Sequence, residues 1–289
     1  MIIRYIGDNG ATVECTNVAP PVPPILLTEA DGLYGYENTV YTSDQGGQDG
    51  SVFVGNRISA RRIGLTLKLY GRVVETRNAI LRSLSPRSLG TLRVIRGDLV
   101  RDIRCVTEKV TTNTQDGSLM NLYFLCPNPY WREENESVVN IATWEPLLSY
   151  PLTIEQGVGF MFGQRTEERV INVRNNGSAV AGMRVVFSAN GTVTNPKIIN
   201  AMDSSQYMLA NVTLYAGDLL TLQTGVGEKK ATLYRANGGV ESNAFSLLDI
   251  AHITFLQLSP GDNYLSYRAA SGEALLTVAV FYYSSYLEV

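Results

Sequence analysis

The second half of the chain alternates short apolar segments with turn sequences, and this pattern restricts the possible folds more than any other feature. Nine segments rich in β-branched and aromatic residues lie between residues 170 and 283, and glycine, asparagine, aspartate or proline separates them. Short strands at such spacing, with apolar residues alternating as in residues 183–187, predict two packed antiparallel sheets. We therefore expect a β-sandwich.

The stretch from residue 118 to residue 133 indicates where a first domain ends. It begins with a strand that is apolar on both faces, which is typical of a strand inside a sheet. Pro127 and Pro129 then remove two backbone donors and end the strand. We expect Tyr130 and Trp131 to cap the core at this domain junction.

A length of 289 residues suits two domains of ordinary size. We place a first domain at residues 1–140, a linker at residues 141–150 and a second domain at residues 151–289. One amphipathic helix is predicted over residues 73–84, with Leu81 on its apolar side. Residues 31–50 have no period and predict a long loop. The chain is therefore predicted to be mainly β with one helix.

Charged residues are balanced overall but not along the chain. The sequence has 24 basic and 27 acidic residues, which gives no overall electrostatic signature for nucleic-acid binding. Residues 57–104, however, carry twelve basic and three acidic residues, whereas residues 1–50 carry one basic and seven acidic residues. The split favours self-association between copies. A nucleic-acid groove and charges scattered over solvated faces are the alternatives, and few aromatic residues accompany the arginines to support the groove.

Cysteine usage and the N-terminal sequence give no sign of a secreted or membrane protein. Cys15, Cys105 and Cys126 share no metal-binding or redox spacing, and their odd number argues against a disulfide scaffold, so we expect buried thiols. The first ten residues lack the regions of a signal peptide, and no apolar run reaches membrane-spanning length. We expect a soluble protein made in a cytoplasm, with no membrane contact.

Residues for catalysis are scarce. The chain has one histidine, His252, within an apolar-flanked run where a structural role is expected. Acidic clusters at residues 133–136 and 167–168 are typical of a solvated surface rather than of a carboxylate pair for glycoside cleavage. The glycine-rich segment at residues 46–51 lacks the lysine of a phosphate-binding loop. We therefore predict no catalytic, cofactor-binding or metal-binding residues, and a protein that is not an enzyme.

Several motifs occur in an order that is shared with one protein family. The first domain has Gly-Gln-Asp-Gly-Ser at residues 47–51, the pair Arg61 and Arg62, a strand that ends in glycine, and the Pro-Asn-Pro-Tyr-Trp junction. The second domain has Gly-Asp at residues 217–218, Leu-Ser-Pro-Gly-Asp-Asn at residues 258–263 and a tyrosine-rich last strand. This order resembles siphophage distal tail proteins, a phage tail component family, from phages or prophages of Gram-positive hosts.

The resemblance implies a fold and a structural function. The first domain would be a split-barrel or sandwich-like ring domain with one α-helix and a long hairpin over residues 99–126, and the second a galectin-like β-sandwich. Six copies would form a ring, single or stacked as two, in the tail tip or baseplate at the distal end of the virion tail, after synthesis in the cytoplasm of the bacterial host. The ring would connect the major tail tube protein with the tail-associated hub or lysin protein, and in some phages with receptor-binding proteins for host attachment.

A ring built from one repeated interface needs two complementary patches on each subunit. We predict that the loop at residues 31–51 and the hairpin at residues 99–126 reach a neighbouring copy. The predicted subunit and partner interface residues are Gln48, Asp49, Gly50, Ser51, Arg57, Arg61 and Arg62.

Two alternative functions stay open. The first is a carbohydrate-binding, adhesin-like module that recognises a host cell-wall saccharide. Sugar-binding galectins use a His-x-Asn-Pro-Arg strand and a stacking tryptophan, whereas His252 is not followed by Asn-Pro-Arg and no tryptophan follows Trp144. The second is a tail-tip hydrolase, for which the sequence has no catalytic signature.

Overall fold

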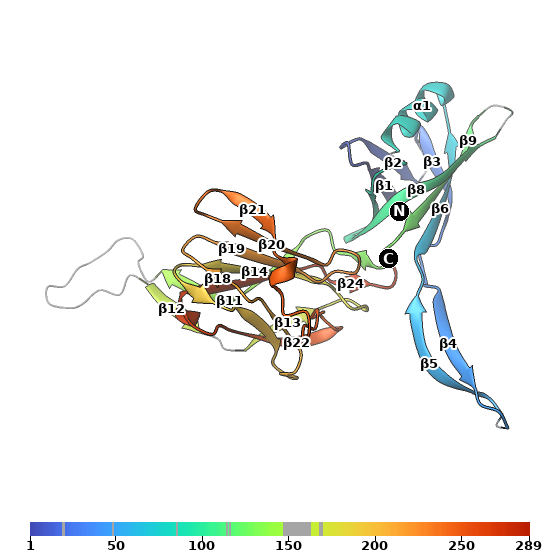
Figure 1. The fold of residues 1–289 in the computed structure, drawn as a ribbon. Helices are drawn as coiled ribbons and strands as arrows, with labels where there is room; N and C mark the ends of the chain where they lie inside the picture. Colours follow the sequence, from blue (N-terminus) through green and yellow to red (C-terminus); the bar gives the residue numbers. More distant parts are fainter. Residues whose placement is uncertain are drawn as a thin grey trace. The chain divides into compact units, whose positions relative to one another are not determined.

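The computed structural model of the chain describes residues 1–18, 21–47, 49–84, 86–113, 115, 117–146, 163–167 and 170–289. Contacts divide the chain into two compact units (Figure 1). The first unit is Met1–Glu134 together with Ser285–Val289, and the second is Asn135–Ser284. Within the described ranges α1 (Val73–Ser83) is the one α-helix, and most other elements are strands. The predicted mainly β fold with one helix is confirmed.

The first unit is built on a nine-stranded sheet that closes on itself. Its strands are β1 (Ile2–Ile6), β2 (Thr12–Thr16), β3 (Ile25–Asp31), β6 (Arg61–Leu69), β7 (Gly90–Arg96), β8 (Leu99–Thr112), β9 (Leu119–Cys126), β10 (Trp131–Arg132) and β24 (Ser285–Tyr286). They pair in the order β24-β10-β8-β7-β1-β2-β3-β6-β9, and an additional pairing of β8 with β9 completes a barrel. A single parallel pair, Thr16 with Leu26, joins β2 to β3. The barrel is therefore nearly split at this point, in agreement with the predicted architecture.

Alternating residues of these strands fill the interior of the barrel. In β6, for example, Ile63, Leu65 and Leu67 are buried, whereas the residues between them are half-buried. The rings of Tyr5 and Phe124 stack in the same core, with their centroids 5.3 Å apart. Burial of apolar surface stabilises the fold by about 25 cal/mol per Å², so this interior is the main source of the first unit's stability.

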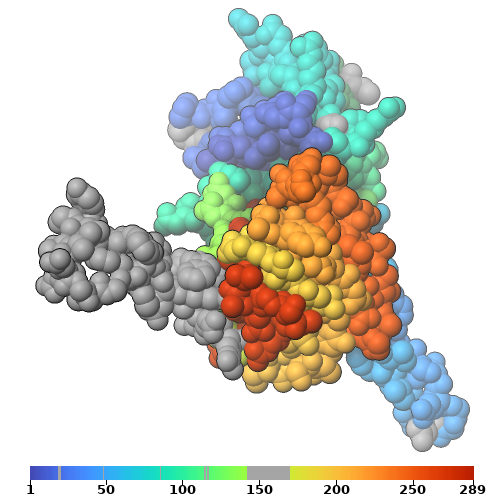
Figure 2. Space-filling view, turned by 60° about the vertical axis from the view of Figure 1, so that its left-hand side comes forward, coloured from blue at the N-terminus to red at the C-terminus, as the bar shows by residue number. Residues whose placement is uncertain are grey.

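Part of the segment predicted as an aperiodic loop, residues 31–50, forms the first strand of a hairpin instead. β4 (Asn38–Asp44) pairs antiparallel with β5 (Ser51–Ile58) as a separate two-stranded sheet. This hairpin, which we call the arm, extends away from the barrel (Figures 1 and 2). Because the chain itself buries neither face of the arm, folding does not require apolar and polar residues to alternate there. The loop prediction was wrong for this reason.

The second unit is the predicted β-sandwich. Its larger sheet has, in order, β12 (Gly163–Glu167), β11 (Ser137–Pro146), β23 (Leu276–Tyr282), β14 (Met183–Ala189), β19 (Leu219–Gln223), β20 (Lys230–Arg235) and β21 (Val240–Asn243). Its smaller sheet has, in order, β13 (Ile171–Asn175), β22 (Gly261–Arg268), β16 (Lys197–Asn200) and β17 (Tyr207–Leu209). A separate two-stranded pair consists of β15 (Val193–Thr194) and β18 (Thr213–Leu214). Two 3₁₀ turns are η1 (Phe245–Leu247) and η2 (Glu273–Leu275). Buried residues of both sheets, such as Val185 and Ile198, form one core.

The two units do not follow the predicted domain boundaries. β11 begins at Ser137 and pairs with β12 and β23 inside the second unit, although the sequence places its start in the first domain and its end in a linker. The last five residues, Ser285–Val289, return to the first unit. Residues 147–150 of the predicted linker lie outside the described residues. Both differences arise because strand pairing between distant segments leaves no local sequence pattern.

Asp218 explains why β19 follows a Gly-Asp sequence. Its carboxylate is buried and accepts hydrogen bonds from the backbone N–H of Tyr215 at 2.9 Å, from Nη1 of Arg235 at 2.6 Å and from the backbone N–H of Ala236 at 3.0 Å. Burial raises the pKa of Asp218, but the three hydrogen bonds and the charge of Arg235 outweigh it, so the net shift of this pKa is downward.

We expect Asp218→Asn to lower the melting temperature of the second unit at pH 7, and the difference from the wild type to shrink in acid. Because the pKa is lower in the folded chain, the stabilisation is complete above the unfolded value of about 4 and is lost as the pH falls through the folded value. Thermal unfolding between pH 7 and pH 2 tests this. Asp262→Asn is the matched control, since the ion pair of Asp262 with Arg174 is partly exposed and contributes less than about 1 kcal/mol. A difference that stayed constant with pH would contradict the expected role of Asp218.

Candidate assembly site at the arm and its base

The arm presents apolar side chains to solvent. Every residue of β4 is exposed, and in β5 only Gly55 and Ile58 are half-buried. The exposed apolar residues of the arm are Val40, Tyr41, Val52, Phe53 and Val54, of which Phe53 is 62% exposed. A two-stranded hairpin without a covering layer is marginally stable in water, and a cluster of exposed apolar residues marks an interaction surface. The arm therefore has the properties of a segment that a partner covers.

Four of the predicted interface residues lie on the arm. Asp49 and Gly50 are in the turn at its tip, Ser51 begins β5, and Arg57 is near the end of β5. All four are exposed, and Gln48 lies outside the described residues. Gly50 has a φ of +89°, a conformation that glycine adopts without strain, which explains a glycine at the tip of this hairpin.

Arg61 lies at the base of the arm and is 7% exposed. Its Nε donates to the carbonyl oxygen of Pro129 at 2.9 Å, and its Nη1 donates to the carbonyl oxygen of Gly32 at 2.8 Å. Nη1 also lies 3.5 Å from the carbonyl oxygen of Leu33, and Nη2 donates to the carbonyl of Leu287. One guanidinium therefore joins the segment before the arm, the exit from β9 and the C-terminal tail.

This arrangement corrects the interface prediction for Arg61. The side chain is directed into its own chain, where burial lowers the pKa of its guanidinium and Glu288 opposes that shift. The adjacent Arg62 is exposed, with Nε 3.4 Å from Oε2 of Glu108. Arg62 is thus available to a partner, and Arg61 positions the base of the arm. Arg61 and Arg62 differ because adjacent residues of a strand point to opposite faces of the sheet. The sequence alone did not show which of the two faces the interior.

The structure brings the predicted junction residues together with Arg61. Trp131 is fully buried in the core of the first unit, and the Arg61 guanidinium carbon lies 5.9 Å from its ring centroid. Tyr130 is half-buried, Pro129 is buried and Pro127 is exposed. The N-terminal segment of the first unit then ends at Glu134, three residues after the tryptophan.

The C-terminal tail completes the base of the arm, and no local pattern in the sequence predicted this contact. Ser285 and Tyr286 form β24, which pairs with β10. The hydroxyl of Tyr286 is 2.5 Å from Oε1 of Glu133, and the Arg101 guanidinium carbon lies 3.7 Å from the centroid of the tyrosine ring. These contacts join residues more than 150 positions apart, and such contacts leave no periodic signal in a single sequence.

A cavity of about 370 Å³ opens at the same base. Gly32, Tyr34 and Tyr36 line it from the segment before β4, and Arg62 and Pro129 line it from the other side. Aromatic rings and an exposed cation therefore surround a space that is large enough for one or more side chains of a partner.

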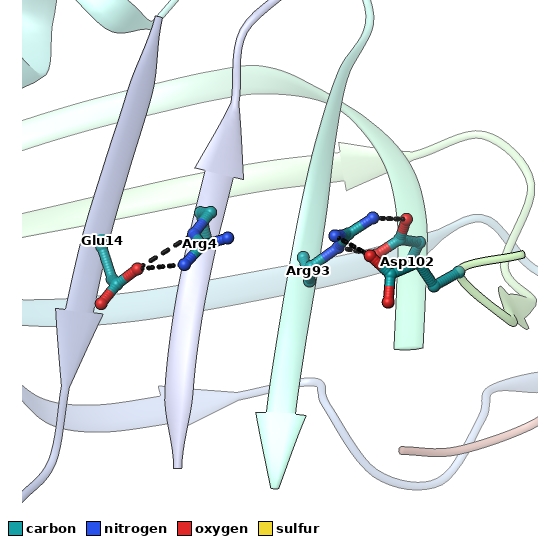
Figure 3. A network of polar contacts seen from close by, with 5 residues as sticks. Arg4, Glu14, Arg93 and Asp102 are labelled. Carbon is teal, nitrogen blue, oxygen red and sulfur yellow. Dashed lines mark hydrogen bonds and ion pairs between the residues drawn. The ribbon is translucent and has the colours of Figure 1, made fainter. Parts of the chain in front are cut away.

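Two sets of ion pairs lie across the outer face of four adjacent strands (Figure 3). Arg4 on β1 donates to Glu14 on β2, with Nη2 2.7 Å from Oε2. Arg93 on β7 donates to both oxygens of Asp102 on β8, at 2.8 and 2.9 Å, and also to Glu134. The hydrogen bonds with Asp102 raise the pKa of Arg93, and burial opposes them. Arg4 and Arg93 therefore have carboxylate partners within their own chain and are not free charges for a neighbouring copy.

The structure also places the one histidine and the three cysteines of the sequence. His252 lies on an exposed turn, with Nδ1 3.1 Å from an oxygen of Asp249, rather than inside the apolar run that the sequence suggested. The three cysteines are free and buried, which confirms the predicted thiols. Burial raises the pKa of Cys15 to about 12, and contact with Cys105 together with burial raises that of Cys126, so neither is a nucleophile near neutral pH.

No group of three or more metal-ligating side chains occurs in the part of the chain that the structure describes. In the same ranges, no helix has both the length and the apolar character needed to cross a membrane.

Fold and site together define a class: a two-unit β-protein with a closed sheet, one helix, a free hairpin and a sandwich. No protein-family model and no curated protein matches the sequence. Among solved structures, the chain is similar to the Dit protein (gp 19.1) of phage SPP1, with a TM-score of 0.65 and 14% identity over 97% of this chain and 98% of that one.

Two further solved structures are baseplates of phage P2 in the activated conformation. The structure with calcium matches with a TM-score of 0.55 and 12% identity over 100% of both chains. The structure with strontium matches with a TM-score of 0.53 and 12% identity over 97% of both chains. At these identities the likeness establishes a shared fold, and it confirms the distal-tail-protein fold that the motifs predicted.

Proposed function

We propose that the chain is a structural protein of a phage tail tip or baseplate, and that six copies form a ring. The ring would join the major tail tube protein to the tail-associated hub protein at the distal end of the virion tail. Support comes from the shared fold over nearly the whole chain with a protein described as a "Paradigm of Hub Adsorption Apparatus in Gram-positive Infecting Phages". This role is structural and needs no catalytic group.

The observation that carries the proposal is the exposed arm. It is a two-stranded sheet outside the barrel, with apolar side chains such as Tyr41 and Phe53 that its own chain leaves in solvent. In a ring every copy uses one patch to contact the next copy and a different patch to receive the previous one. The arm provides the first of these patches on each copy.

Removal of the arm should abolish assembly and leave the barrel folded. The backbone N–H of Ser59 donates to the carbonyl of Glu37 at 2.9 Å, so the two ends of the arm are adjacent. An Asn-Gly turn, the preferred two-residue hairpin connection, can therefore replace residues 38–58. We expect rings of the wild type and monomers of this armless variant, by native mass spectrometry and negative-stain electron microscopy.

Thermal unfolding provides the control for this experiment. The armless variant should melt within a few degrees of the wild type, because the arm contributes no residue to the core of the first unit. Closed rings formed by the armless variant, or a wild type that never forms a closed ring on its own or on purified tail tubes, would contradict the proposal.

A further inference from the structure

Helix α1 has an unusual outer side. Ile80, near the middle of the helix, and Leu84, just after its end, are buried against the barrel. On the other side, Val74 is 57% exposed and Leu81 is 44% exposed. The prediction that Leu81 belongs to the buried side was wrong. These two residues are seven positions apart and so lie on one side of the helix, where a surface helix normally carries polar residues.

Basic residues accompany this apolar side. We call the exposed residues of α1 and of the segment that follows it the helix patch, which consists of Val74, Leu81, Arg82, Arg87 and Leu89. The helix itself has one acidic residue, Glu75, which pairs with Arg72 at 3.2 Å. The helix patch is therefore apolar and positively charged.

The arm has the complementary composition. Its apolar residues are flanked by Glu37, Asp44 and Asp49, with Arg57 as the one basic residue of β4 and β5. An apolar, acidic ribbon and an apolar, basic helix side attract each other, and such pairing also discourages contacts between like surfaces. The arm is also long enough to cover the helix, because the eight residues of β5 span about 26 Å and the eleven residues of α1 span about 16 Å.

The arm of one copy cannot cover its own helix patch. Figure 1 shows α1 and the arm at opposite ends of the first unit. A contact between them therefore joins two copies, and it is heterologous, as a ring requires.

We propose that the helix patch receives the arm of a second copy of this chain. The inference rests on the proposed ring, and it names the surface that closes the contact. Val74 and Leu81 supply apolar surface for arm residues such as Phe53, and Arg82 and Arg87 face the acidic positions of the arm.

A complementation experiment tests this pairing. The double variant Leu81→Asp with Arg82→Glu removes the apolar and basic character of the helix patch but keeps the arm. The armless variant keeps the helix patch. We expect each variant to be monomeric alone, and an equimolar mixture to form a one-to-one heterodimer by native mass spectrometry, because one intact contact exists between them.

A matched double variant on the second unit controls for surface changes in general. Val170→Asp with Arg174→Glu alters an exposed valine and an exposed arginine in the same way, and it should form rings like the wild type. Circular dichroism should show each variant folded, since the altered side chains are exposed.

The possible failures can be told apart. Wild-type rings together with rings of the Leu81→Asp, Arg82→Glu variant would overturn the assignment of the helix patch and leave the proposed ring intact. Wild-type rings with no heterodimer in the mixture would likewise overturn the assignment of the helix patch and leave the proposed ring intact. A wild type that forms no ring would contradict both proposals.

Discussion

Replacement of Arg61 by methionine is expected to reduce the free energy of unfolding of the first unit by about 3 kcal/mol, which is roughly 10 °C in melting temperature. Methionine keeps most of the side-chain volume, so the loss comes from the hydrogen bonds. The carbonyl oxygens of Gly32, Pro129 and Leu287 would lose their shared donor in a buried site. Each buried acceptor left unsatisfied costs about 1–3 kcal/mol.

The neighbouring arginine provides the matched control for this substitution. Arg62→Met removes a side chain whose ion pair with Glu108 is largely exposed, and it should change the free energy of unfolding by less than about 1 kcal/mol. Urea unfolding can be monitored by tryptophan fluorescence in a Trp144→Phe background, in which the buried Trp131 reports on the first unit. Equal effects of the two substitutions would show that Arg61 does not hold the base of the arm.

Gly32→Ala is expected to have the larger effect, about 4 kcal/mol or a failure to fold. Gly32 has a φ of +75°, and a Cβ atom there would lie 2.0 Å from the carbonyl oxygen of Arg62. That oxygen belongs to β6, so the backbone at the base of the arm would have to move. The same shift would pull the Gly32 carbonyl away from Arg61.

Gly35 is the control for backbone conformation alone. It has a similar φ of +69°, but an added Cβ would meet nothing within 4 Å. Gly35→Ala should therefore cost only the strain of the left-handed conformation, about 1 kcal/mol. Melting temperatures of the two variants, compared with the wild type, measure the difference. A Gly32→Ala variant as stable as Gly35→Ala would contradict the close approach of Gly32 to β6.

Arg61 and Arg62 show which features of the site the sequence could predict. The motif around Arg61 and Arg62 was visible, but the sequence assigned both residues to a partner surface. The structure separates them because β6 directs alternate side chains to the interior and to solvent. The partners of Arg61 come from three distant segments, and no local pattern could have identified them.

The arm illustrates the opposite case, in which composition was informative and periodicity was not. The composition of residues 31–51, rich in glycine, tyrosine and acidic residues, suggested a segment outside the core, and the arm is exposed. Strand β4 was missed because period-two alternation appears only when one face is buried within the chain.

By itself, the sequence determined the mainly β class, the sandwich of the second unit and the single helix. These follow from local patterns of apolar residues, turns and prolines, which the chain needs in order to bury its own cores. Only the tertiary structure decided the pairing of β6 with β9 in the closed sheet, the return of the C-terminal tail, the burial of Arg61 and the exposure of Leu81. Each of these depends on contacts between residues far apart in the chain, and the free energy of such contacts is not encoded in any one segment.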